Sequence, residues 1–525
     1  MARARRCAPL LLLALLPCGG PGRAAPVALA ETAPASAPPA VAALALSLDG
    51  RLALSDNANG AAAEAARTDL IGLLRPGVQY VHQGAGLEVT LKASAALVGT
   101  ADGSQPAGLR PDADATVAAT VLPQWLFVDG GLRLRQTEID PFGPRVDDGS
   151  AAANRRTEGN VRLSPRLEHA FGPGLRFMLR QDSRYTHHAA GSENDLVTEA
   201  SDLRFEQRPQ PLGAAVDLSR LDSLQRGLPA SRLTLETVRL QALAALDGPG
   251  LDALRMTAEI GQDLRRNALG QHRDPLAGLR VDWQPNERST LTAGLNRRFF
   301  GRGGEVEIHH RTPWLSVSLG WRRAPMLVAQ ATDAGVAATT PLAALDAMLT
   351  TRHPQAAERR ARVAEAAQQG GLDPAPAGPV ESSAAYPQLL SEARLDLAWT
   401  SPRTTLSLAV WQRTTRALLK AGDPLAVGQA ATADNRQEGG ALQLSHRLTP
   451  TLSVAALAQV SRIAGIGLQA GPRSEDRLAR LSFVQAVAPR TTLDAGVQQA
   501  RYTTTVGDAL PHRANQVFVG VSERF

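Results

Sequence analysis

The stretch RANQVFVGVSERF, residues 513–525, alternates apolar and polar side chains and closes on an aromatic residue. Successive side chains of an extended strand point to opposite faces, so its apolar residues share one face. These residues are Val517, Val519, Val521 and Phe525. Such a strand suits a wall with lipid on one side and a polar lumen on the other. An edge strand of a soluble sandwich has the same alternation, so this stretch alone leaves both folds open.

The same alternation returns along most of the chain, in runs such as 87–97, 126–135, 175–184, 279–283, 315–322 and 404–413. Many runs last about 10 to 15 residues, whereas strands of soluble sheets usually hold roughly five or six. A tilted strand needs roughly 9–11 residues to cross a bilayer. The runs therefore favour an outer-membrane β-barrel. In that setting the four apolar residues of 513–525 resemble a C-terminal insertion signal for the barrel-assembly machinery.

Connections between the runs form two groups that take alternate places along the chain. Short turns lie at 83–86, 123–124, 172–174, 247–250, 284–287, 311–313, 401–402, 449–450 and 489–490. Longer links lie at 56–67, 100–111, 138–156, 188–196, 268–274, 323–388, 418–434, 465–473 and 505–512. Bacterial barrels sort their connections this way, with tight periplasmic turns and longer outer loops. The sequence therefore predicts an all-β fold: a transmembrane antiparallel up-and-down barrel over 43–525, with about 22 strands in a range of roughly 18–24.

Bulk composition excludes several other classes of protein. The 525 residues carry a formal net charge of +6 and a mean hydropathy of −0.14. Past the N-terminus no run of about 18 apolar residues occurs, so transmembrane helices are not expected. All but two of the 56 basic residues are arginine, and aromatic residues make up 4%. Because the arginines are spread along the chain and stacking aromatics are scarce, we expect no nucleic-acid partner.

The first residues predict export from the cytoplasm. Residues 1–30 contain early arginines, an apolar run at 10–16 and a small-x-small site at 28–30, which together are typical of a signal peptide. Both cysteines, Cys7 and Cys18, lie within this segment. The processed chain would therefore have no thiol chemistry. A lipoprotein box ending at Cys18 is the alternative interpretation.

Two segments interrupt the strand pattern. Residues 31–42, rich in Ala and Pro, predict a flexible leader into the barrel. Residues 323–388 form the one non-β block, with helical spacing over 341–349 and a charged helical stretch from Pro354 that Gly370-Gly371 closes. Strand parity places this helical insertion on the extracellular side. It is either a lid or constriction over the lumen, or a helical hairpin that only covers the barrel mouth.

Polar strand faces are the best candidate for function. Nine arginines fall on faces that we expect to line the lumen: Arg133, Arg135, Arg176, Arg180, Arg184, Arg255, Arg280, Arg298 and Arg322. Charged rings set selectivity in pores, and inward arginines suit an anionic solute or an acidic polysaccharide. Aspartates and glutamates are interleaved with them, so the alternative is an arginine–carboxylate ladder that only stabilises the wall.

Sequence signals of catalysis or of bound cofactors are absent. The adjacent histidine pairs at 187–188 and 309–310 lie on strands, where neighbouring rings point to opposite faces and cannot share one metal. No Gly-x-Ser-x-Gly elbow and no glycine-rich phosphate loop occurs. We therefore expect no enzyme, no metal and no cofactor.

Three segments together resemble a known family. They are Asp140–Pro144, then Arg297–Gly301 with His309–Thr312, and then Arg352–Pro354 with Ala357–Arg359. In their order and spacing the chain resembles the PEP-CTERM system-associated outer-membrane β-barrel family, which is found with exopolysaccharide loci. The resemblance covers nearly all of the mature chain, and none of its motifs is catalytic. It implies an outer-membrane location and a link to polysaccharide or protein export.

The sequence as a whole predicts an integral outer-membrane barrel that is porin-like or an export-associated component linked to exopolysaccharide systems. Its expected partners are outer-membrane lipid, the barrel-assembly machinery, and polysaccharide or export components. Two alternatives stay open: a general solute porin, and a sealed barrel that serves as a structural or surface-display protein. An energy-coupled receptor is not expected, because no plug-length segment precedes the first strand.

Overall fold

The structure is a computed structural model that describes residues 41–525, apart from 146–153, 173, 189–194, 226–231, 247–252, 268–269, 327–339, 351, 374–377, 381–387, 419–433, 468–469 and 507–510. The predicted signal peptide, 1–30, lies outside the described residues, as does all but the end of the predicted leader, 31–42. The first strand begins at Val41, close to the predicted start of the barrel at residue 43.

Twenty-two strands make up the fold. The first eleven are β1 (Val41–Ser55), β2 (Asp69–Gln83), β3 (Leu87–Thr100), β4 (Gly108–Leu122), β5 (Leu126–Thr137), β6 (Arg156–Phe171), β7 (Leu175–His188), β8 (Leu196–Gln207), β9 (Leu212–Gln225), β10 (Leu233–Leu246) and β11 (Leu254–Asn267). The others are β12 (Gly270–Asn286), β13 (Ser289–Arg298), β14 (Gly301–Arg311), β15 (Leu315–Met326), β16 (Gln388–Thr400), β17 (Thr404–Ala417), β18 (Asn435–Arg447), β19 (Leu452–Gly465), β20 (Arg473–Ala488), β21 (Thr491–Thr504) and β22 (His512–Arg524).

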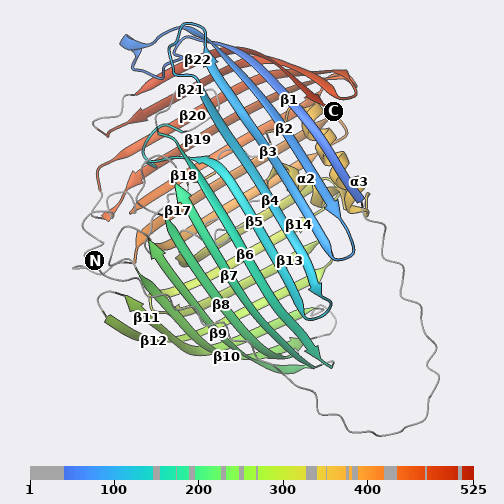
Figure 1. Cartoon of the computed structure of the whole chain (residues 1–525), viewed down its shortest axis with the longest axis vertical. Helices are drawn as coiled ribbons and strands as arrows, with labels where there is room; N and C mark the ends of the chain where they lie inside the picture. Colours follow the sequence, from blue (N-terminus) through green and yellow to red (C-terminus); the bar gives the residue numbers. More distant parts are fainter. Residues whose placement is uncertain are drawn as a thin grey trace, which may run out of the picture. The chain divides into compact units, whose positions relative to one another are not determined.

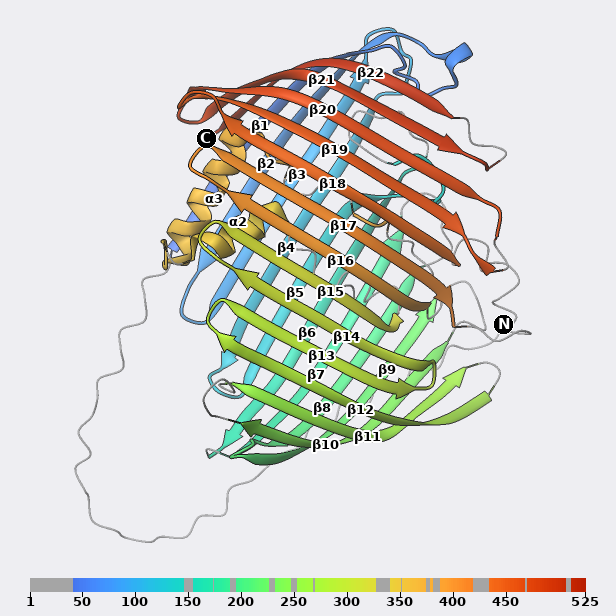
Figure 2. The same ribbon diagram turned by 180° about the vertical axis from the view of Figure 1, so that it is seen from behind.

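Each strand pairs antiparallel with the next one in the chain, and the last strand returns to the first. β22 pairs with β1 from Ser47 opposite Arg524 to Ser55 opposite Gln516. This seam closes the sheet into a single up-and-down barrel, which Figures 1 and 2 show from opposite sides. The predicted fold class and the predicted count of 22 strands are confirmed.

The barrel turns its apolar side chains outward. Leu279, Leu295 and Val517 are 63%, 68% and 61% exposed, and their partners in neighbouring strands are apolar or small. The residues that alternate with them point inward and include the polar ones. Many of these are buried, such as Ser164 and Asp263 at 0% exposed. An outward apolar band with a polar interior is the arrangement that a bilayer requires of a barrel. The protein is therefore integral to the outer membrane.

No helix among the described residues is both long enough and apolar enough to cross a membrane.

The two ends of the barrel differ in their connections. At one end lie 84–86, 123–125, 172–174, 208–211, 247–253, 287–288, 312–314, 401–403, 448–451 and 489–490, together with the C-terminus. We call it the short-turn end, which faces the periplasm in bacterial barrels. The opposite, long-loop end holds 56–68, 101–107, 138–155, 189–195, 226–232, 327–387, 418–434, 466–472 and 505–511. Two connections at this end, 268–269 and 299–300, are only two residues long, so the link predicted at 268–274 is shorter than expected because β12 begins at Gly270.

The predicted helices form within the long insertion between β15 and β16. Helix α2 spans Pro341–Leu349, and Thr340 caps it by accepting a hydrogen bond from the Ala343 amide at 3.1 Å. Helix α3 spans Ala356–Gly370 and ends at Gly371, whose φ of 61° is the left-handed conformation that glycine adopts most readily. A short 3-10 turn, η1 (Ala63–Ala65), lies in the connection between β1 and β2.

The position of these helices corrects the prediction of an extracellular insertion. Both lie beside the C-terminus (Figure 2), although the insertion leaves β15 and enters β16 at the long-loop end. Strand parity identifies the end at which a connection starts. It does not show whether that connection folds back into the lumen, and here it does.

Candidate functional site

Helices α2 and α3 form a hairpin that packs on the inner wall of the barrel. We call residues 340–373 the luminal hairpin. Leu345, Met348, Val363 and Leu372 are buried together with Ala398, an inward residue near the end of β16. Each such side chain gains about 1.5–3 kcal/mol when it leaves water, so this contact alone stabilises docking substantially.

Polar contacts hold the hairpin at the short-turn end. Arg311, the last residue of β14, donates through Nη1 to the Ala347 carbonyl at 3.1 Å. The Ser445 hydroxyl, near the end of β18, donates to the Gly370 carbonyl at 2.7 Å. The Arg352 guanidinium lies 4.2 Å from the ring centre of Trp314, which belongs to the turn after β14. Each contact joins the hairpin to the last residues of a strand or to a short turn, so the hairpin occupies this mouth of the barrel.

The chain returns to the long-loop end after the hairpin. Val380 donates its amide to Oε1 of Gln437 at 2.7 Å, and Gln437 donates back to the Val380 carbonyl at 3.0 Å. Gln437 lies at the start of β18, on the inward face. Val380 also packs with Phe142 and with Ile463 at the end of β19. The described parts of the insertion therefore contact the inner wall at both ends of the barrel.

Arg145 supports this returning segment from the connection after β5. Its guanidinium donates to the Gly378 carbonyl and to the Ser461 hydroxyl, each at 2.7 Å. Burial lowers the pKa of Arg145, and the carboxylates of Glu138 and Asp476 oppose that shift. The group thus acts as a charged clamp between the insertion and β19.

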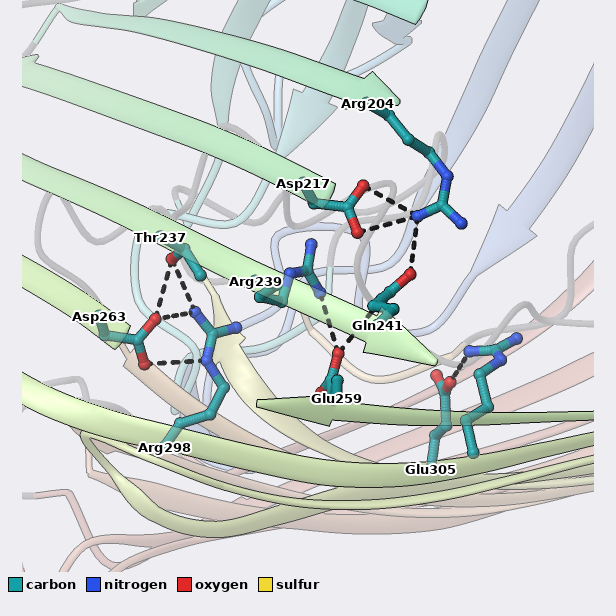
Figure 3. Close-up of polar contacts among 10 residues, drawn as sticks. Arg204, Asp217, Thr237, Arg239, Gln241, Glu259, Asp263, Arg298 and Glu305 are labelled. Carbon is teal, nitrogen blue, oxygen red and sulfur yellow. Dashed lines mark hydrogen bonds and ion pairs between the residues drawn. The ribbon is translucent and has the colours of Figure 1, made fainter. Parts of the chain in front are cut away.

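A different lining covers the wall that the hairpin leaves free. Along β8–β14 arginines meet carboxylates across neighbouring strands (Figure 3). Arg204 Nη1 lies 2.8 Å from Asp217 Oδ1, and Arg298 Nη2 lies 2.6 Å from Asp263 Oδ1. Arg298 belongs to β13 and Asp263 to β11, so this pair bridges over β12. Such a ladder balances charge within the wall.

Six of the nine predicted lumen arginines form contacts of this kind, four of them on β5 and β7, outside the stretch β8–β14. Arg133 pairs with Asp114 at 2.9 Å, Arg135 with Glu158 at 3.4 Å, and Arg176 with Glu168. Arg180 donates to the Ser164 hydroxyl at 2.9 Å, Arg280 pairs with Asp282 at 2.8 Å, and Arg298 pairs with Asp263. Arg184 is buried, and Arg255 and Arg322 lie opposite Asp282 and Glu305 in the strand registers. They are spread over the wall and do not converge on one ligand site.

The residues predicted as an insertion signal lie on the outer surface. Val517, Val519, Val521 and Phe525 are 61%, 52%, 42% and 57% exposed. Phe525 donates its amide to the Leu46 carbonyl at 2.9 Å, which extends the pairing of β22 with β1 by one step. Their role in assembly stays a prediction.

Sequence reasoning missed a second group of charged residues beside the hairpin. A cavity of about 660 Å³ lies between α3 and the inner wall of β1, β2 and β20–β22. Its charged lining consists of Arg51, Arg75, Arg480 and Arg524 with Asp49, Asp373 and Asp494. Arg480 Nε donates to Gln498 Oε1 at 2.8 Å, and the Arg51 guanidinium lies 3.7 Å from the ring centre of Phe518. Six of the seven lie on the face of their strand that carries the polar residues. The alternation in the sequence could therefore have placed them on the lumen side. Asp373 comes from the hairpin and could not be placed from the sequence.

Metal ligands do not gather anywhere in the described part of the chain. No group of three or more His, Cys, Asp or Glu side chains has the geometry to hold an ion there. His309 Nε2 lies 2.9 Å from the Glu307 carboxylate on the same strand, which is an isolated pair.

No family model matches the sequence, and no curated protein is significantly similar to it. Three solved structures are similar to the chain at low identity. The siderophore receptor PirA from Pseudomonas aeruginosa is 11% identical over 92% of this chain and 80% of its own, with a TM-score of 0.42. The FrpB iron transporter from Neisseria meningitidis (F5-1 variant) is 8% identical over 91% and 82%, with a TM-score of 0.47. The outer-membrane protein OpdK from Pseudomonas aeruginosa is 8% identical over 92% and 98%, with a TM-score of 0.31. At these values the likeness carries no inference about function, and the fold rests on the strand registers.

Proposed function

We propose that this protein is a porin-like, non-catalytic conduit of the outer membrane. In this proposal the luminal hairpin narrows the passage at the short-turn end and leaves a charged path beside α3. The observation that carries the proposal is the cavity between α3 and the wall, because it extends along β22 from Arg524 at the short-turn end as far as Gln516 and is lined by charged groups of both signs.

The part of the inner wall that the luminal hairpin does not contact favours an aqueous lumen and not a sealed one. Arg133 and Asp114 point inward from β5 and β4, yet each side chain is 46% exposed. Arg280 and Asp282 on β12 are likewise 46% and 38% exposed. Inward groups keep this much exposure only where open space lies before them, and charged groups in open space are hydrated. Water-filled lumens with charged walls conduct ions and small polar solutes.

The charges around the cavity favour anions slightly. Four arginines and three aspartates line it, which leaves a formal charge of +1. Arginine binds carboxylate and phosphate groups through two parallel hydrogen bonds. An acidic saccharide is thus a suitable cargo. The link to polysaccharide or protein export that the family resemblance implies extends the proposal to that cargo.

Single-channel conductance in planar bilayers tests this proposal. We expect the wild-type barrel to conduct, and we expect a variant in which a short Gly-Ser linker replaces residues 340–373 to conduct more, because the mouth is then wider. Shortening the connection 101–107 is the matched control, since it alters a long loop that does not line the cavity beside α3. No current from folded, heat-modifiable wild-type protein and from the hairpin deletion would mean a sealed structural barrel.

Charge substitutions locate the path. Arg480→Gln with Arg524→Gln changes the formal charge of the cavity lining from +1 to −1 and should lower the anion-to-cation permeability ratio. Arg133→Gln with Arg135→Gln removes two inward arginines of β5, which do not line the cavity, and should change the ratio less. An equal change in both variants would mean that the general lumen, and not the cavity beside α3, sets selectivity.

A further inference from the structure

The outer surface of β12–β15 carries a second charged feature near the long-loop end. One arginine on each of these four adjacent strands lies within three residues of the strand's end: Arg273, Arg297, Arg302 and Arg323. We call this set the outer arginine arc. Arg273, Arg297 and Arg302 are exposed and Arg323 is half-buried.

Strand registers place the arc on the face that looks away from the lumen. Arg297 lies directly opposite Arg302, and Arg323 lies opposite Gly304, which shares a face with Arg302. On the same face, Leu295 lies two residues from Arg297 and Ile308 lies six residues from Arg302, and they are 68% and 39% exposed. Because side chains alternate, the arginines and these lipid-facing residues belong to one surface.

The arc has no acidic counterpart. The outward positions of β12–β15 hold no Asp or Glu, since the acidic residues of these strands, such as Asp274, Asp282 and Glu305, all have the inward parity. None of the four arginines forms an ion pair with any residue that the structure describes. Some arginines elsewhere on the outer surface are paired, as Arg462 and Arg477 are with Glu475, whereas Arg501 and Arg513 face each other across β21 and β22.

This arrangement is unfavourable without a bound anion. Arg297 and Arg302 are like charges directly opposite each other in an antiparallel pair, which destabilises a sheet. An anion between them would turn repulsion into two charge-assisted contacts.

An apolar floor lies directly beneath the arginines. At Gly304 a Cβ atom would come within 3.0 Å of the Leu295 side chain and 3.2 Å of the Trp321 ring. The two side chains therefore close over the glycine backbone between Arg302 and the lipid-facing Ile308. Tryptophan at this level is typical of the boundary between hydrocarbon and headgroups. Charge above and apolar surface below match a lipid whose anionic headgroup sits on its acyl chains.

We propose that the outer arginine arc binds a phosphorylated glycolipid of the outer leaflet. A phosphate on its sugar headgroup lies between Arg297 and Arg302, within reach of Arg323. Its acyl chains lie along Leu295 and Ile308. Arginine suits this role because its planar guanidinium binds phosphate through two hydrogen bonds and its apolar stem lies along the lipid surface. The site is independent of any solute path through the lumen.

Native mass spectrometry of the purified full-length barrel with added lipid A tests the proposal. We expect Arg297→Ser with Arg302→Ser to weaken lipid A binding about tenfold or more, since two charge-assisted contacts are lost. The matched control is Arg462→Ser with Arg477→Ser, which removes two outward arginines near the same end that already have an acidic partner. Unchanged binding in the arc variant, or an equal loss in the control, overturns the proposal.

Two further arms separate the possible ligands. Fully dephosphorylated lipid A should bind the wild type no better than it binds the arc variant, and equal binding of both lipid forms would reduce the site to an apolar surface. Inorganic phosphate that binds as tightly as lipid A would mean a soluble-anion site and would also overturn the proposal.

A stability measurement covers the case in which the substitutions disturb the fold. Without lipid A, the arc variant should unfold at a higher temperature than the wild type because the repulsion is gone. With lipid A the order should reverse. A variant that is less stable under both conditions is damaged. In that case Arg297→Lys with Arg302→Lys replaces it, and wild-type lipid affinity in the lysine variant would contradict bidentate phosphate binding.

Discussion

Cysteines at Gly370 and Ser445 are expected to form a disulfide that fixes the luminal hairpin to β18. A Cβ atom built on Gly370 lies 3.7 Å from the Cβ of Ser445. Disulfides join Cβ atoms that are about 3.5–4.5 Å apart, so the pair Gly370→Cys with Ser445→Cys meets the requirement without movement of the backbone. The bond would close a loop of about 75 residues, which the chain-entropy model equates with about 4.5 kcal/mol of stabilisation.

The assay is gel mobility of the denatured barrel with and without reductant. The only native cysteines are Cys7 and Cys18, both in the predicted signal peptide, so the background of thiols is low. The matched control is Gly370→Cys with Leu444→Cys. Leu444 is the neighbouring residue on β18, but it is 37% exposed on the outward face, so its thiol would lie on the other side of the wall. We expect a reductant-sensitive shift in the first variant only.

Conductance of the oxidised variant then tests the proposed path. If solutes pass beside a docked hairpin, the locked barrel should conduct as the wild type does, both before and after reduction. Absence of the disulfide would refute the placement of α3 on β18. A locked barrel that conducts only after reduction would refute a fixed passage, since the hairpin would then have to leave the wall.

Four further substitutions or treatments probe the barrel. Gly371→Val should loosen the hairpin by about 1–3 kcal/mol, because φ is 61° and a Cβ would lie 2.7 Å from Val484, and noisier single-channel currents would reveal it. Arg298→Met should lower barrel stability by about 3–5 kcal/mol by leaving the Asp263 carboxylate buried without its partner, and Asp263→Leu in the same chain should restore heat resistance. Deleting Phe525 should reduce the folded barrel in outer-membrane fractions while total synthesis stays constant. Protease added to intact cells should leave α3 uncut, and rapid cleavage there would place the hairpin outside the lumen.

The wall of the barrel could be predicted because its signal is local. Alternation in runs such as 315–322 and 404–413 is fixed by which face meets lipid, and most strands show it within their own residues. The helix bounds could be predicted for the same reason, since Pro341 begins α2 and Gly371 ends α3. Both features follow from backbone chemistry within a few residues.

The position of the hairpin could not be predicted from these local rules. Leu345 and Met348 show that α2 has an apolar face, but they do not show which surface covers it. A weak signal lay in the wall: the inward positions of the later strands include apolar residues such as Ala398, Leu457 and Val484, where an aqueous lumen would favour polar ones. Joining that signal to α2 requires contacts between distant parts of the chain. The cavity beside α3 depends on the same contacts.

The hairpin also makes the two sides of the barrel differ in how they tolerate change. On β16 the inward Glu392 and Asp396 are 2% and 6% exposed, whereas on β4 and β5 the inward Asp114 and Arg133 keep nearly half their side-chain surface. A scan of all single substitutions should therefore find two patterns of tolerance along the strands. Along β16 and β19 every second position, the inward set, should resist almost any change. Along β4 and β5 the inward set should accept most polar residues, and only charges on the lipid side should be rejected. The tolerance profile alone would then trace the part of the wall against which the insertion lies.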